Sequence, residues 1–201
     1  MVRPGMFFIS MPTEFVMVYT REELAALYAT CQKYGLRLFI DGARLGYGLV
    51  SAACDYDLPF LAKHCDVFYI GGTKVGAMMG EAVVFSGMKA PKYFFTNVKR
   101  HGALLAKGRM LGIQFDTLFT DELYFKISRH AIAMATRIRS IFEKHGITFA
   151  YDSPTNQQFV VLSPALYEAL SQKVAFEIWE RKSEHEIICR FVTSWATKEE
   201  E

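Results

Sequence analysis

The chain has 201 residues, of which 51% are hydrophobic and 22% are charged, and its formal net charge is +2. This length and apolar content are enough for a sizeable core, whereas near-neutrality argues against nucleic acid as the main partner. No apolar run approaches the ~20 residues that a membrane-spanning helix needs, and the first residues carry no signal-peptide cleavage pattern. We therefore expect a cytoplasmic protein with neither a nucleic-acid nor a membrane partner.

Strands and helices alternate over the first half of the chain. Residues 6–10 (MFFIS) fit a buried strand, and Thr20 with Glu23 forms the capping box of a helix that ends at Gly35. The further elements expected here are a strand at 36–40, a short helix within 58–65, and strands at 66–72 and 81–86. Apolar strands that alternate with helices predict a mostly parallel α/β sheet, buried on both faces. The segment between Gly72 and Ala82 is too short for a helical crossover, which predicts an antiparallel last strand.

The second half of the chain has a different character. Basic residues interleaved with aromatic ones fill the stretch 87–109, which we interpret as a solvated face or an anion site rather than a nucleic-acid surface. We expect a long helix over 121–146, two strands around a turn within 147–163, a helix over 164–171 and a strand over 186–195. These elements predict a small α+β domain over residues 121–201, attached to part of a larger domain over residues 1–120. Thr197 and Glu200 have the spacing of a helix start.

The four cysteines lack the CxxC or finger spacing of a metal site and stand at Cys31, Cys54, Cys65 and Cys189. We expect buried or partly buried, reduced thiols. Cys65 follows His64, but adjacent residues of a regular element point to different sides. No metal site is predicted.

Charged residues follow two of the expected strands. Asp41 and Arg44 come directly after one strand, and the motif GGTK places Lys74 just after another. Because ligands of parallel sheets bind beyond the carboxyl ends of the strands, these groups are candidates for one site. A partly desolvated lysine has an accessible neutral, nucleophilic form. An Asp41–Arg44 salt bridge with an ordinary turn lysine is the structural alternative. A carboxylate and a reactive lysine at neighbouring strand ends suit pyridoxal phosphate (PLP) chemistry.

The motifs FIDGARLGYGL, CDVFYIGGTKVGAMMGEAVVF, RHGALLAKGRMLGIQF and CRFVTSWAT together resemble the threonine aldolases of the aromatic amino-acid beta-eliminating lyase family. The resemblance implies the aspartate aminotransferase-like fold of PLP enzymes (fold type I). It implies that Lys74 binds the cofactor covalently and that Asp41 pairs with the pyridine nitrogen. It also implies that Arg44 lies near the cofactor and the substrate carboxylate, that Arg190 binds that carboxylate, and that Lys107 reaches a neighbouring subunit's cofactor phosphate.

The implied reaction is the cleavage of threonine or allo-threonine to glycine and acetaldehyde, in a homodimer or homotetramer with sites at subunit interfaces. A beta-eliminating lyase acting on an aromatic or sulfur amino acid is the alternative within the same family. A non-catalytic protein that keeps the fold for binding or assembly is the alternative outside enzymes. Family chains are longer, and the part that supplies their phosphate loop and ring-stacking residue has no match here. We therefore expect this chain to be an incomplete fragment, inactive alone.

Overall fold

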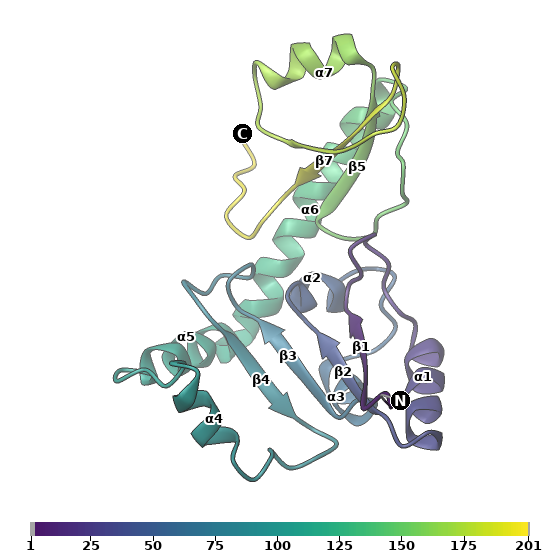
Figure 1. Ribbon diagram of the computed structural model, residues 1–201. Coiled ribbons are helices and arrows are strands. Elements are labelled where there is room, and N and C mark those ends of the chain that lie inside the picture. Colours follow the sequence, from purple (N-terminus) through teal and green to yellow (C-terminus); the bar gives the residue numbers. More distant parts are fainter. Residues whose placement is uncertain (1–2, 201) are drawn as a thin grey trace.

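The computed structural model describes residues 3–200 and contains two sheets connected by a long helix, α6 (Leu123–Lys144) (Figure 1). The first sheet has the order β1-β2-β3-β4, with strands β1 (Met6–Ser10), β2 (Arg37–Asp41), β3 (Val67–Gly71) and β4 (Glu81–Phe85). The first three strands are parallel and β4 runs antiparallel to β3, which confirms the predicted reversal.

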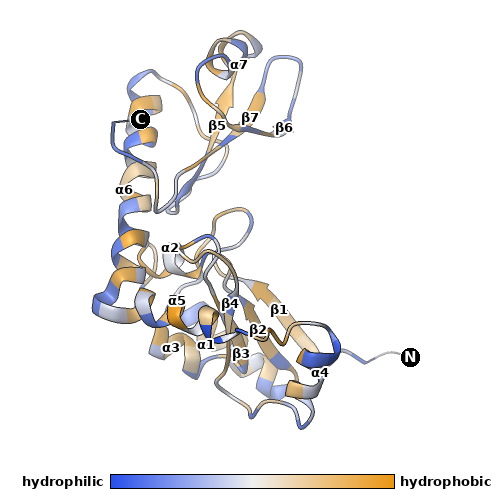
Figure 2. Cartoon of the chain, turned by 90° about the vertical axis from the view of Figure 1, so that its left-hand side faces the viewer, coloured by the Kyte–Doolittle hydropathy of each residue, from blue (hydrophilic) through white to orange (hydrophobic). Residues whose placement is uncertain are grey.

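Helices pack on one face of this sheet (Figures 1 and 2). They are α1 (Arg21–Lys33), α2 (Leu45–Leu49), α3 (Leu58–Lys63) and α6. Alternate residues of β2 and β3 point toward these helices, so that Leu38 and Phe68 are buried in the main core. The predicted capping box is confirmed, because Thr20 Oγ1 accepts from Glu23 N at 3.2 Å and Thr20 N donates to Glu23 Oε2 at 2.8 Å.

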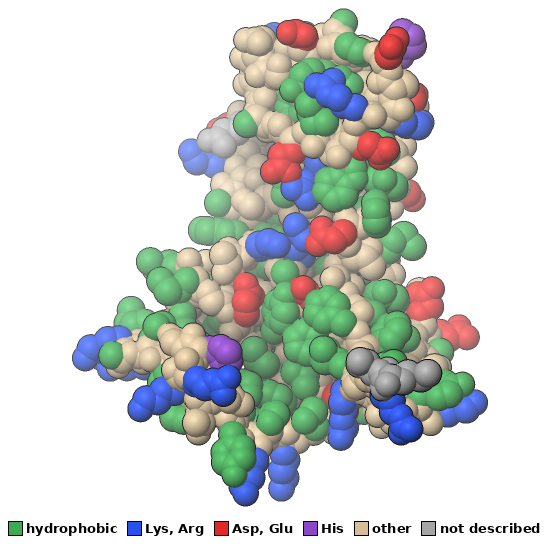
Figure 3. Space-filling model, in the orientation of Figure 1, with side chains coloured by type: hydrophobic (Ala, Val, Ile, Leu, Met, Phe, Trp, Pro, Cys, Tyr) green, Lys and Arg blue, Asp and Glu red, His purple; other side chains and the backbone are tan. Residues whose placement is uncertain are grey.

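The opposite face of the first sheet carries a row of aromatic rings. Phe8 stacks on Phe39 with ring centroids 5.4 Å apart, and Tyr69 lies 6.1 Å beyond Phe39. Figure 3 shows hydrophobic side chains gathered over this face. Phe8 is 54% exposed, so the expectation of a buried first strand in a sheet covered on both faces is wrong for the described residues. The reason is geometric: β1 is an edge strand, and the helices contact the other face.

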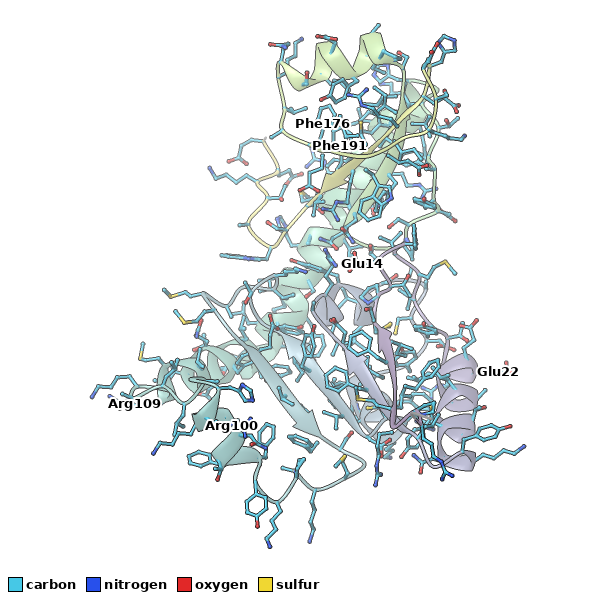
Figure 4. The ribbon with its side chains drawn as sticks, in the orientation of Figure 1. Glu14, Glu22, Arg100, Arg109, Phe176 and Phe191 are labelled. Atoms are coloured by element: carbon cyan, nitrogen blue, oxygen red, sulfur yellow. The ribbon has the colours of Figure 1, made fainter. Side chains whose placement is uncertain are left out.

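The second sheet is antiparallel, with the order β5-β7-β6. Its elements are β5 (Gln157–Leu162), α7 (Pro164–Ser171), β6 (Glu177–Arg181) and β7 (Ile187–Val192). Phe176 and Phe191 stack with centroids 4.6 Å apart in the small core beside this sheet (Figure 4). The expected fold class, α/β with a mostly parallel sheet and a smaller α+β part, is confirmed. The domain boundary at residue 120 stays a prediction.

Several elements differ from the expectation. Three helical segments occupy the basic stretch and its continuation, namely α4 (Phe94–Arg100), α5 (Arg109–Phe119) and the 3₁₀ turn η1 (Thr120–Glu122). Of the two strands expected within 147–163, the first is reduced to a single bridge between Phe149 and Val160. Thr197 Oγ1 accepts from Ser194 N, three residues earlier, at 2.9 Å and closes a turn, and the helix start expected at Thr197 stays a prediction.

Among residues 3–200, no helix is long and apolar enough to cross a membrane, and no group of three or more His, Cys, Asp or Glu side chains is placed to hold a metal ion. All four cysteines are free thiols; three are buried and Cys54 is partly buried, as expected.

Candidate active site

The carboxyl ends of β2 and β3 meet in direct backbone contact. Gly71 N donates to Gly42 O at 2.9 Å. A Cβ at Gly42 would lie 1.9 Å from the Tyr69 carbonyl oxygen, and one at Gly71 would lie 2.3 Å from the Ala43 carbonyl oxygen. Because side chains are excluded at both positions, the loop after β2 and the loop after β3 approach more closely than other residues would allow. These glycines therefore bring the loop of Arg44 and the loop of Lys74 together.

A pocket of 370 Å³ opens where these two loops face the second sheet. Its lining includes Arg44 and Lys74 from the strand ends, together with Gln157, Glu177 and Arg190 from the second sheet. Another cavity, of 460 Å³, lies between α6 and β7 and has a mostly apolar lining. The smaller pocket brings together an amine, two guanidinium groups, a carboxylate and amides, so it is the candidate active site.

Lys74 has the electrostatic surroundings of a reactive amine. Partial burial lowers the pKa of its ammonium below the ordinary value of 10.5, and the nearby Arg44 guanidinium lowers it further. The carboxylates of Glu14, Asp41 and Glu81 act in the opposite direction without cancelling the shift. Solvent still reaches the side chain. The neutral form of this amine is therefore more accessible than that of a surface lysine.

Tyr47 holds the backbone beside this amine. Its hydroxyl donates to the Lys74 carbonyl oxygen at 2.5 Å, and its ring is 1% exposed within the main core. Burial raises the pKa of Tyr47 to about 12. Tyr47 is therefore a neutral hydrogen-bond donor that connects α2 to the lysine loop.

Asp41 is half-buried at the end of β2, and its Oδ1 accepts from Ala43 N at 3.0 Å. It does not line the pocket itself, although its carboxylate acts on the pKa of Lys74. Within residues 3–200, no ion pair joins Asp41 to Arg44. Arg44 Nη1 instead lies 3.6 Å from Glu14 Oε1, so the local Asp41–Arg44 salt bridge of the structural alternative is absent from this part of the chain.

Arg190 lies on the central strand of the second sheet and is held from several sides. Its Nη1 donates to Gln157 Oε1 at 3.2 Å, and its Nη2 pairs with Glu177. The guanidinium carbon lies 5.1 Å from the centroid of the Trp179 ring. The arginine side chain is 17% exposed. This arrangement fixes a planar cation at the wall of the pocket, opposite the lysine loop.

Lys107 lies apart from these groups. It is exposed in the turn that precedes α5 and does not line the pocket. Figure 4 shows Arg100 and Arg109, on α4 and α5, well away from Glu14, which lies between the two sheets. The structure thus brings together Lys74, Arg44 and Arg190, with Asp41 in electrostatic contact, and leaves Lys107 outside the pocket. Its expected contact with a neighbouring subunit stays a prediction.

Sequence reasoning missed Tyr47, Gln157 and Glu177, which line the pocket. Tyr47 lies inside the DGARLGYGL motif, and its position one helical turn after Arg44 is a signal that could have found it. Gln157 lies in a run of polar residues, TNQQ, that ends in a buried strand, which is an unusual place for amides. Glu177 gives no such signal, because its contact with Arg190 depends on the register of β6 against β7.

The sequence profile of the family described as "Beta-eliminating lyase" matches residues 16–165. This range is most of the chain and includes β2, β3 and β4 of the first sheet, with Lys74. The chain belongs to the beta-eliminating lyase family. Similar proteins of this kind include the low specificity L-threonine aldolase of Pseudomonas sp. (strain NCIMB 10558), 31% identical over 85% of this chain and 50% of that protein. The low specificity L-threonine aldolase of Pseudomonas aeruginosa is 29% identical over 84% of this chain and 49% of that protein.

A solved structure agrees with this family assignment. The threonine aldolase of Leishmania major superposes with a TM-score of 0.96 at 38% identity, and the match covers 100% of this chain and 58% of that one. A PLP-bound protein from Clostridium difficile 630 superposes with a TM-score of 0.65 at 14% identity, which shows a shared fold alone. The chain spans about half the length of the curated relatives that it matches.

Proposed function

We propose that this beta-eliminating lyase family chain carries the lysine-bearing part of a PLP-dependent carbon–carbon lyase of the threonine aldolase type. The observation that carries the proposal is the pocket that places Lys74, an amine with a lowered pKa, together with Arg44 and Arg190. An amine that can react with an aldehyde and two cations that can bind a carboxylate are the groups that PLP and an amino acid require.

The residues present fit this cofactor. Lys74 would hold PLP covalently, and Asp41 would pair with its pyridine nitrogen from the end of β2. When bound, PLP supplies an electron sink for a bond broken at the amino acid's Cα. Arg190 and Arg44 would bind the substrate carboxylate and so choose which Cα bond is aligned for cleavage. Buried donors without partners in this pocket, such as Arg190 Nε, are consistent with an acceptor-rich ligand.

The relatives support threonine as the substrate class, because both Pseudomonas proteins carry the name low specificity L-threonine aldolase. We further propose a homodimer or homotetramer in which Lys107 contacts the cofactor site of a neighbouring subunit. Its exposed position before α5 is compatible with such a contact. Light scattering of the purified chain measures the oligomeric state.

Product analysis tests the reaction class. The chain loaded with PLP is incubated with L-threonine, L-allo-threonine, L-tyrosine or L-cysteine, and acetaldehyde, glycine and ammonia are quantified beside a Lys74→Ala control. We expect equal amounts of acetaldehyde and glycine from threonine or allo-threonine, lost in the control. Ammonia from tyrosine or cysteine, without acetaldehyde from threonine, would instead identify the chain as an eliminating lyase. Cofactor attachment without any product would restrict the proposal to cofactor binding.

A further inference from the structure

Amide side chains of the Lys74 pocket carry polar atoms with no hydrogen-bond partner. Asn156 and Gln157 are 2% and 1% exposed, and both line the pocket. Among the described residues, four buried side-chain atoms lack a partner, namely Asn156 Oδ1, Gln157 Nε2, Gln158 Oε1 and Arg190 Nε. Three of the four belong to residues that line this one pocket. Because buried polar groups are nearly always hydrogen-bonded, their concentration here indicates a polar ligand.

The orientation of each amide follows from its hydrogen-bond partner, which can only donate in one case and only accept in the other. Arg190 Nη1 donates to Gln157 Oε1, and a guanidinium has no acceptor, so Gln157 Nε2 is the atom that remains available. Asn156 Nδ2 donates to the Thr193 carbonyl oxygen at 2.7 Å, which leaves Asn156 Oδ1 as the available acceptor. The pocket therefore has two buried donors, Gln157 Nε2 and Arg190 Nε, and one buried acceptor.

This set matches an amino acid that carries a hydroxyl. A guanidinium N–H, Arg190 Nε, and the amide donor Gln157 Nε2 beside it suit the carboxylate, and the acceptor suits a hydroxyl or ammonium hydrogen. We infer that Gln157 is a further ligand-binding residue, which donates from Nε2 to the carboxylate of the amino acid bound at Arg190. The inference deepens the proposed function and rests on it for the identity of the ligand.

The contacts of Arg190 indicate how the carboxylate enters. Glu177 pairs with Nη2 from an edge strand, and its side chain is 65% exposed, so it can move into solvent. Gln157 is buried at the start of β5, so its hydrogen bond with Arg190 Nη1 stays in place. An incoming carboxylate therefore replaces Glu177 while Gln157 keeps the guanidinium in place and contributes its own donor.

Tryptophan fluorescence gives a binding readout that does not depend on turnover. Both tryptophans of the chain lie at this site: Trp179 lies under the Arg190 guanidinium and Trp195 lines the pocket. The PLP-loaded chain, and the chain without PLP, are titrated with L-threonine and with L-threoninol, which lacks the carboxylate. The variants are Gln157→Met, which keeps the side-chain length and removes both polar atoms of the amide, and Gln158→Met as the control. Gln158 is equally buried with an unpartnered Oε1 but does not line the pocket.

We expect Gln157→Met to weaken L-threonine binding at least tenfold, because it removes both the donor to the carboxylate and the acceptor that holds Arg190 Nη1, and to leave L-threoninol binding unchanged. Gln158→Met should change neither. Gln157→Glu keeps the shape and an acceptor for Arg190 but adds a competing carboxylate, so it should weaken L-threonine binding further while favouring the cationic L-threoninol. This second variant keeps the test valid where Gln157→Met does not fold.

Equal weakening of both ligands in Gln157→Met, no change in either, or no preference of the wild-type chain for L-threonine over L-threoninol would overturn the inference. The proposed function fails separately. A chain that attaches no PLP, yet prefers L-threonine in a Gln157-dependent way, refutes the cofactor proposal and retains the carboxylate contact.

Discussion

Gly42→Ala tests whether the backbone contact between β2 and β3 holds the candidate site together. The new Cβ would lie 1.9 Å from the Tyr69 carbonyl oxygen, whereas such contacts are not found below 3.0 Å, so the two strand ends must separate by about 1 Å. Both sides of this contact are backbone, and no side chain can rotate away. Overpacking of this kind costs about 3 kcal/mol. For a chain of this size the expected loss in melting temperature is roughly 6–12 °C.

Urea unfolding followed by circular dichroism measures the change in the free energy of unfolding. Gly112→Ala is the matched control, because Gly112 lies within α5 and a Cβ there has no heavy atom within 4 Å. The control should be neutral or stabilising by about 0.5–1 kcal/mol. A Gly42→Ala variant as stable as the control, with unchanged cofactor attachment, would refute the role given to this strand junction.

Three further outcomes follow from the described contacts. Asp66→Ala removes the buried carboxylate that accepts from Leu38 N at 2.9 Å and from Arg37 Nη1 at 2.8 Å. We expect the free energy of unfolding, measured by urea titration, to fall by about 2–3 kcal/mol. A loss below about 0.5 kcal/mol would contradict this. Arg44→Gln removes a cation that lowers the pKa of Lys74, whereas Glu14→Gln removes an anion that raises it. At a fixed pH below that pKa, Lys74 should react with an amine reagent more slowly in Arg44→Gln and faster in Glu14→Gln. Peptide mass spectrometry measures the extent of reaction. Changes in reaction rate of the same sign in both variants would be inconsistent with the electrostatics. Lys107→Ala should leave PLP attachment unchanged in a monomer and weaken it in an oligomer whose subunits share their sites. The visible absorbance of each fraction from size-exclusion chromatography measures the attached PLP. Weaker attachment in a monomeric fraction would count against the placement of Lys107 outside the pocket of its own chain.

Most of the first sheet could be predicted from the sequence, because strong local signals set its elements. The capping box at Thr20 and the short connection before β4 predicted a helix start and a strand reversal that the structure has. The same signals failed to predict that the ring row of Phe8, Phe39 and Tyr69 is uncovered. Apolar composition predicts that a strand packs on something, but it does not identify which faces are covered by the residues of one chain.

The candidate site, too, could be predicted from the sequence only in part. Lys74 and Arg44 follow strands directly, so their meeting at one edge of the sheet could be expected from topology. Arg190 was assigned through family resemblance alone, since its distance from Lys74 in the sequence gives no geometric link. Gln157 and Glu177 were missed, because their contacts with Arg190 depend on the pairing of three antiparallel strands. Long-range register of that kind leaves little trace in a single sequence.

Covalent mapping of the cofactor tests the central claim most directly. The purified chain is mixed with PLP, reduced with borohydride, digested and analysed by mass spectrometry, with Lys74→Ala treated identically. We expect the pyridoxyl label predominantly on Lys74 at stoichiometric PLP, together with a visible absorbance band that survives gel filtration and is absent from the variant. A label spread over exposed lysines, or an unchanged band in Lys74→Ala, would contradict the assignment of this pocket as a PLP site.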